Sequence, residues 1–192
     1  MARWEPGATQ RLVVAAVDLF TEQGYDATTV AQIAERAGVT KSTFFRHFSD
    51  KRELLVAGQE TLSRLLADGI GEAPEGASPL EAVAAGLERA SSAMGPANRE
   101  LGPRVKAAVA ASTELQERDA LKSVGLAAAM TAALTARGFP EPTAHLAAEL
   151  GVLAFKRGYA QWSEGARGDA EDLAPHALAA LQDLRSAAAL LG

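Results

Sequence analysis

The residues best suited to chemistry lie between Thr28 and Lys51, where short polar and basic side chains follow a glycine-centred turn. The run Thr40 to Thr43, TKST, opens a short helical pattern, and the next acid is Asp50. Hydroxyl and ammonium groups at the start of a helix can bond to the base edges and phosphates of DNA. The stretch therefore predicts a helix that binds nucleic acid, although a plain helical hairpin would show the same spacing.

Two short helical patterns position these groups, and Gly38 separates them. Thr29 can cap the first pattern, and Gln32 three residues later can complete a capping box. Thr40 can cap the second pattern after a short turn, which is the spacing of a helix-turn-helix motif. The side chains expected to pack inward from the second pattern are Phe44 and Phe48, which lie four residues apart.

The distribution of charge supports a nucleic-acid partner more than the total does. The net charge of −5 argues against phosphate binding at first. Residues 1–55, however, hold 7 Lys and Arg against 7 Asp and Glu, so the excess of acid lies in the remainder. A small basic patch is expected from Lys41, Arg46, Lys51 and Arg52, with only Asp50 among them.

The remainder of the chain predicts an all-α fold of about nine helices, because apolar residues recur with helical spacing and never alternate as in strands. We expect a three-helix helix-turn-helix DNA-binding domain at residues 1–50 and a helical ligand-binding and dimerisation domain at residues 51–192. The longest helical patterns cover residues 113–137 and 143–164.

Several functional classes are disfavoured by what the sequence lacks. The chain has no cysteine, and His47, His145 and His176 have no metal-ligand spacing. No phosphate loop, nucleophile elbow or HExxH motif is present, so we expect neither an enzyme nor a cofactor or metal. Without a signal peptide or a run of about 18 apolar residues, we expect a cytoplasmic protein that does not enter a membrane. An all-helical dimeric scaffold, or an enzyme without DNA binding, is the alternative.

The segment from Gly24 to Lys51, GYDATTVAQIAERAGVTKSTFFRHFSDK, resembles the N-terminal pattern of the TetR family of bacterial transcriptional regulators. The resemblance is specific over about the first quarter of the chain, and beyond it rests on helix number and order. It implies a homodimer that binds a palindromic double-stranded DNA operator, usually to repress, and releases it when a small molecule binds. A TetR-like activator is the second reading.

The resemblance also assigns roles to residues of the motif. Thr29, Thr40 and Lys51 would contact phosphates, Lys41 to Thr43 would read bases, and the aromatic at Phe45 departs from the family's usual tyrosine, so one phosphate bond is lost. The predicted DNA-binding residues are Thr29, Thr40, Lys41, Ser42, Thr43, Phe45, Arg46, His47 and Lys51.

The pattern from Thr143 to Glu164 is apolar on two faces, one with Leu146, Leu150 and Leu153 and the opposite one with Val152, Phe155 and Tyr159. Two apolar faces indicate contact with its own domain and with a second surface. A fully buried central helix of a monomer is the alternative. The resemblance implies that the partner is the same helix pair of a second subunit. The predicted dimer-interface residues are Val152, Phe155, Tyr159, Trp162, Leu173, Ala177, Leu181 and Leu184.

An effector site is predicted in the helical remainder of the chain. Alanine-rich middle helices could leave a cavity, and the stretch from Asn98 to Lys122 resembles a TetR subgroup with acyl-CoA-like effectors, so the small molecule is expected to be apolar or acyl-like. Arg157 lies among leucines and could contact an acidic ligand, pair with Glu149 or Glu164, or extend to solvent. The predicted ligand-binding residues are Met94, Leu126, Met130 and Arg157.

Overall fold

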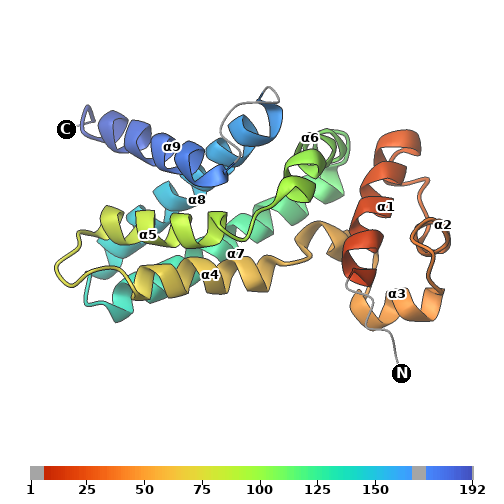
Figure 1. Ribbon diagram of the computed structural model, residues 1–192, viewed down its shortest axis with the longest axis horizontal. Coiled ribbons are helices and arrows are strands. Elements are labelled where there is room, and N and C mark those ends of the chain that lie inside the picture. Colours follow the sequence, from red (N-terminus) through yellow and green to blue (C-terminus); the bar gives the residue numbers. More distant parts are fainter. Residues whose placement is uncertain (1–6, 166–171, 192) are drawn as a thin grey trace. The chain divides into compact units, whose positions relative to one another are not determined.

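The computed structural model describes residues 7–165 and 172–191, and all regular structure in this part of the chain is helical, which confirms the all-α prediction (Figure 1). The chain forms two compact units. Unit 1 comprises residues 1–57 and 104–121, and unit 2 comprises residues 58–103 and 122–192. Within the described ranges, no helix is both long and apolar enough to span a bilayer.

Unit 1 begins with three α-helices, followed by a 3₁₀-helix called η1. Their bounds are α1 Ala8–Gln23, α2 Val30–Arg36, α3 Lys41–His47 and η1 Lys51–Val56. Leu12, Ile33 and Phe44, one from each α-helix, are fully buried in its core. Burying one such side chain contributes about 1.5–3 kcal/mol, so these three residues account for much of the stability of the helix-turn-helix.

The caps predicted for this region are present. Thr29 and Gln32 form a reciprocal capping box, with Gln32 N donating to Thr29 Oγ1 at 3.3 Å and Thr29 N donating to Gln32 Oε1 at 2.8 Å. Thr40 Oγ1 accepts from Thr43 N at 3.1 Å. Both short helices therefore begin where the sequence indicates.

The remaining helices are α4 Gln59–Gly71, α5 Pro79–Ser91, α6 Pro96–Ala110, α7 Thr113–Ala136, α8 Glu141–Glu164 and α9 Leu173–Ala188. Helices α6 and α7 contribute residues to both units. Their connected ends, residues 104–121, bury Ala108 and Leu115 in the same apolar cluster as Phe44. The division thus differs from the expected boundary near residue 50, because this hairpin returns to complete the core of unit 1.

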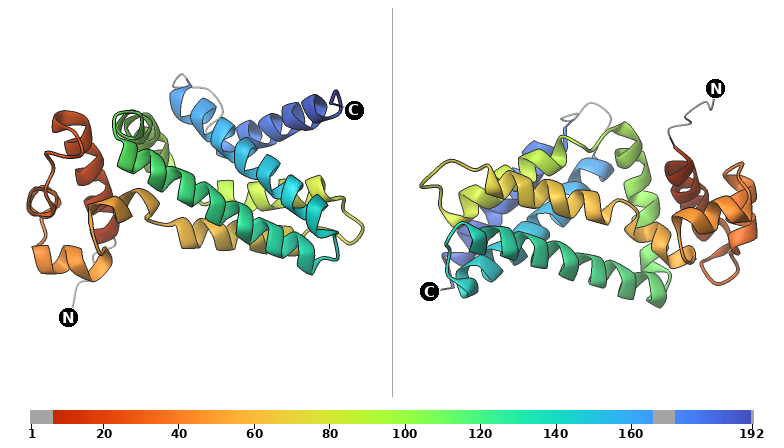
Figure 2. Two further views of the ribbon diagram at one scale, coloured as in Figure 1. Left: turned by 180° about the vertical axis from the view of Figure 1, so that it is seen from behind. Right: turned by 90° about the horizontal axis from the view of Figure 1, so that it is seen from below.

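Glycines allow close helix pairing in unit 2, where α4 lies beside α5 and α8 crosses α9 (Figures 1 and 2). A Cβ placed on Gly86 would lie 2.7 Å from the carbonyl oxygen of Leu66 in α4. A Cβ on Gly158 would lie 2.5 Å from the backbone N and Cα of Ala177 in α9. At both positions only glycine permits the observed approach of the two backbones.

Arg137, just after α7, forms hydrogen bonds with the end of α4 and the residues that follow it. Its guanidinium donates to the carbonyl oxygens of Gly71 at 3.1 Å, Ala73 at 2.9 Å and Pro74 at 2.8 Å. The last carbonyls of a helix lack partners within the helix, so this arginine acts as a tertiary C-cap.

Candidate nucleic-acid interface

The outer face of α3 is exposed because its inner face is anchored by aromatic rings. Phe44 is 0% exposed and Phe48 is 8% exposed, with their ring centroids 5.7 Å apart. On the opposite side Lys41 and Ser42 are exposed, and 56% of Phe45 is accessible. Phe44 and Phe48 thus fix which face of α3 can meet another molecule.

A hydrogen-bonded row runs along this outer face. The hydroxyls of Thr40 and Thr43 lie 3.0 Å apart, and Arg46 Nη2 donates to Thr43 Oγ1 at 3.1 Å. His47 follows, exposed, with Nδ1 3.4 Å from the hydroxyl of Thr9 in α1. The row places neutral hydroxyls and cationic groups within one helix length, a set that can bond to both bases and phosphates.

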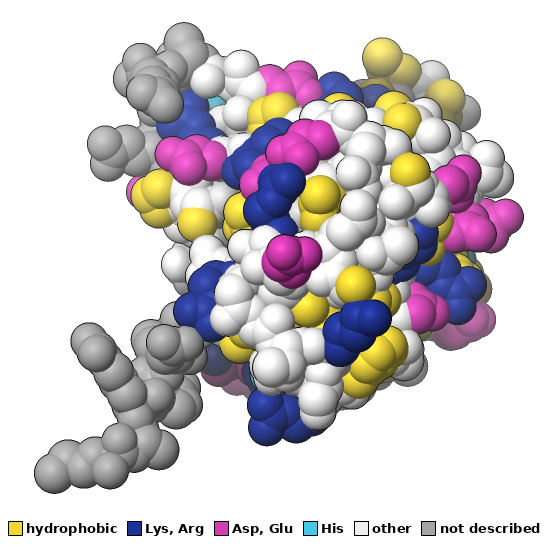
Figure 3. All heavy atoms as spheres, turned by 90° about the vertical axis from the view of Figure 1, so that its right-hand side faces the viewer, with side chains coloured by type: hydrophobic (Ala, Val, Ile, Leu, Met, Phe, Trp, Pro, Cys, Tyr) yellow, Lys and Arg dark blue, Asp and Glu magenta, His cyan; other side chains and the backbone are white. Residues whose placement is uncertain are grey.

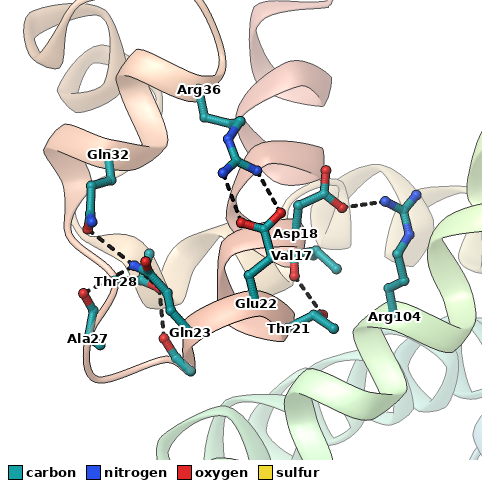
Figure 4. Close-up of polar contacts among 11 residues, drawn as sticks. Val17, Asp18, Thr21, Glu22, Gln23, Ala27, Thr28, Gln32, Arg36 and Arg104 are labelled. Carbon is teal, nitrogen blue, oxygen red and sulfur yellow. Dashed lines mark hydrogen bonds and ion pairs between the residues drawn. The ribbon is translucent and has the colours of Figure 1, made fainter.

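Several basic side chains near the motif form ion pairs within unit 1. The positive charge available for DNA is therefore smaller than the sequence indicated. Arg52 pairs with Asp50 at 2.8 Å, and this contact lowers the pKa of the Asp50 carboxyl. Arg36 pairs with Glu22 through two bonds of 2.8 and 2.9 Å (Figure 4). On the face drawn in Figure 3, Lys and Arg side chains are scattered among neutral and acidic ones instead of forming one broad basic area.

Lys51 has contacts other than those predicted. Its ammonium donates to the carbonyl oxygens of Tyr25 at 2.6 Å and Thr28 at 2.9 Å. The predicted phosphate ligand is therefore occupied by the turn that joins α1 to α2. The sequence contains no signal for these contacts, since 26 and 23 residues separate the partners.

The hairpin of residues 104–121 is bound to the motif by polar contacts that no sequence pattern indicates. Arg104 forms an ion pair with Asp18 of α1 (Figure 4). Arg118 donates to both carboxylate oxygens of Glu53 in η1 at 2.7 Å. Burial, and then a hydrogen bond with Glu114, raises the pKa of Tyr25. The first helix of the motif and the segment that follows α3 are thus both held by the same hairpin.

Comparison with known proteins identifies this arrangement. Residues 12–57 match the model of the bacterial regulatory proteins of the tetR family. The regulator TcmR of Streptomyces glaucescens is 37% identical over 86 residues, which are 41% of this chain and 38% of TcmR. The transcriptional activator FasR of Mycolicibacterium smegmatis is 38% identical over 63 residues, which are 33% of this chain and 29% of FasR. The chain belongs to the TetR family.

The fold of this TetR-family chain extends the likeness beyond the motif. A TetR-family regulator from Syntrophomonas wolfei superimposes with a TM-score of 0.62 over 95% of both chains at 19% sequence identity. At that identity the likeness concerns the fold alone. The chain spans less than two fifths of the length of TcmR and of FasR, which are named as a transcriptional regulator and a transcriptional activator.

The residues predicted for the dimer interface lie largely within the protomer's own core. Seven of the eight predicted residues are buried in the protomer's own core, and the eighth, Tyr159, packs against that core. The seven are Val152, Phe155, Trp162, Leu173, Ala177, Leu181 and Leu184. The outward face of α8 instead carries Leu146, 62% exposed, and Leu153, 41% exposed. The inward face of α8 is the side that α9 approaches, where Gly158 meets the backbone of Ala177.

Of the four predicted effector residues, three pack in or against the core of unit 2 and the fourth, Arg157, does not. Leu126 and Met130 are buried in the core of unit 2, and Met94 packs against that core. The methyl carbon of Met130 lies only 2.4 Å from the position of a Cβ on Gly151, so this region is tightly filled. Arg157 is exposed on α8. It therefore does not join the other three, and the structure matches the reading in which it extends to solvent.

Proposed function

We propose that this TetR-family protein is a ligand-responsive transcriptional regulator of the cytoplasm. It binds a palindromic operator as a homodimer and represses transcription. The observation that carries the proposal is the exposed outer face of α3, with Lys41, Ser42 and Thr43 at its start and buried Phe44 behind it. Residues near the start of a recognition helix are those that contact base edges in the major groove.

We assign base contacts to Lys41, Ser42 and Thr43, while Arg46 and His47 lie along the backbone. Thr29 and Thr40 contact phosphates near the helix starts, in addition to capping them. Phe45 has no hydroxyl, but its exposed ring can pack against sugar or a thymine methyl group.

The experiment that tests the proposal is selection of DNA from a random duplex library by the full chain. We expect two inverted half-sites, because one short helix contacts few base pairs. Their centres should lie about one or two turns of the DNA helix apart. An all-helical scaffold or an enzyme would be favoured if the recovered sequences were unrelated. The same conclusion would follow if the protein did not bind heparin, or bound it without a steep salt dependence.

A dimer requires an exposed surface, and we assign it to the outward face of α8. Leu146, Leu150 and Leu153 follow one another at helical spacing, with Arg157 next on the same face. The buried residues that the sequence indicated are unavailable, whereas Leu146 and Leu153 expose large apolar side chains. A second copy of the same face would remove both from water.

Replacing Leu153 with glutamate is therefore expected to convert the dimer into a monomer, because two carboxylates would face each other across an apolar contact. Sedimentation velocity measures the change. Val124→Glu is the matched control, since Val124 is 63% exposed but lies on α7. Dissociation by the control alone, or by neither variant, would refute the assignment.

The small-molecule effector is proposed to be apolar or acyl-like, because the core of unit 2 around Leu126 and Met130 is apolar. Its entry would require movement of these packed side chains. Activation is the second candidate for the sign of regulation, and the matched region of FasR, named as an activator, favours including it. The position of the operator relative to the promoter distinguishes the two.

A further inference from the structure

Lys51 opens η1, three residues after Phe48, and its ammonium is turned into unit 1. It lies 2.6 Å from the carbonyl oxygen of Tyr25 and 2.9 Å from that of Thr28. The same nitrogen is 4.0 Å from the centroid of the Tyr25 ring. An ammonium has three donors, so two are used by carbonyls while the ring stabilises its charge.

The two carbonyls belong to the turn that leads into α2. Tyr25 is 6% exposed and Thr28 is 1% exposed. The Thr28 hydroxyl donates to the carbonyl oxygen of Gly24 at 2.7 Å, and the amide of Gln23 donates to that hydroxyl at 3.2 Å (Figure 4). This turn therefore has hydrogen bonds of its own, and Lys51 connects it to the segment that follows α3.

Thr29 follows this turn directly and caps α2 while its own side chain stays exposed. Any displacement of Thr28 moves Thr29 with it, because adjacent Cα atoms are a fixed 3.8 Å apart. Lys51 thus sets the position of Thr29, and of the start of α2, relative to the end of α3. A phosphate contact by Thr29 would depend on this placement.

We propose that Lys51 is a positioning residue for DNA binding, which holds the turn before α2 through the carbonyls of Tyr25 and Thr28, and is not a phosphate ligand. The inference rests on the proposed function of unit 1. Lys51 would then act through Thr29. The exposed Arg46, which donates to the hydroxyl of Thr43, is the better candidate for a phosphate contact.

The salt dependence of binding separates the two roles of Lys51. Each phosphate neutralised by a protein cation contributes about 0.9 to the slope of log K against log salt. With the full chain and a duplex recovered by library selection, Lys51→Met is expected to weaken binding roughly 3- to 10-fold, the equivalent of one or two hydrogen bonds. Its slope should equal that of the wild type.

Arg46→Met is the matched control, because it removes one exposed cation from α3 and should lower the slope by about 0.9. A fall of this size for Lys51→Met would overturn the inference. Lys51→Gln provides a second variant that can keep one carbonyl bond without the charge, should Lys51→Met fail to fold. It is expected to bind with intermediate affinity and an unchanged slope, and a reduced slope would again overturn the inference.

A double-mutant cycle tests the action through Thr29. Thr29→Ala should weaken binding in the wild-type chain but change it less than twofold in the Lys51→Met chain, because Thr29 is already displaced there. Equal losses in both chains would show that Lys51 acts independently, contrary to the inference. If the wild-type chain selects no DNA at all, the proposed function fails, and the positioning role in DNA binding fails with it.

Discussion

Phe44→Ala is expected to destabilise unit 1 by about 3–5 kcal/mol, which is the usual cost of removing a fully buried phenylalanine ring. Phe44 is 0% exposed and contacts the rings of both Phe45 and Phe48. Folded domains are stabilised by only about 5–15 kcal/mol, so this loss is a large part of the total for a domain of this size. Chemical denaturation, followed by circular dichroism, measures the change.

Phe45→Ala is the matched control because it removes the same ring from the neighbouring position, where 56% of the side chain is exposed. Its effect on stability should stay below about 1 kcal/mol, as expected for a surface position. Binding to DNA should weaken, since the exposed ring lies on the proposed contact face. Similar destabilisation by the two variants would contradict the assigned orientation of α3.

Gly158→Ala should destabilise unit 2 by roughly 1–3 kcal/mol, because the added methyl group meets backbone atoms that cannot rotate away. The nearest atoms are the N and Cα of Ala177, both 2.5 Å from the new Cβ. The helix propensity gained by replacing glycine, about 1 kcal/mol, offsets only part of this cost. A thermal unfolding scan of the full chain detects the change.

Gly71→Ala is the control for this substitution. Gly71 ends α4, and no atom of a neighbouring element lies within 4 Å of a Cβ placed there. The variant should be neutral or slightly more stable, because alanine restricts the unfolded chain. Stabilisation by Gly158→Ala as well would show that α8 and α9 do not approach as closely as described.

The local features of unit 1 were predictable because they depend on short sequence separations. Thr29 and Gln32 cap as expected, and Phe44 and Phe48 face inward because four residues return to the same side of a helix. The all-α fold follows in the same way from helical periodicity. The partners in each of these interactions lie within about one helical turn of each other. The local sequence is therefore enough to predict them.

The contacts that complete unit 1 were not predictable from such patterns. Arg104 and Asp18 are 86 residues apart, and Arg118 and Glu53 are 65 residues apart. Neither arginine differs in sequence context from an exposed helical arginine. The position of the hairpin depends on buried Leu115, whose place in the core of unit 1 no local pattern specifies.

The inward face of α8 could have been recognised from its smallest residues. Gly151 and Gly158 lie on the side that packs against Met130 and against Ala177, respectively. The face with the large leucines is the more open one, since Leu146 is 62% exposed. Glycine within a long helical pattern is the better indicator of close helix contact, since it costs helix stability unless packing compensates.

Sequence reading by α3 is tested most directly by measuring DNA binding of Lys41→Ala on a panel of single-base variants of the selected duplex. Lys41 is exposed at the first position of α3, so we expect discrimination at one base pair in each half-site to fall by about 1–3 kcal/mol. Preferences at the other positions should persist. Uniform weakening across the panel, or unchanged discrimination at every position, would contradict the claim that the start of α3 reads DNA sequence.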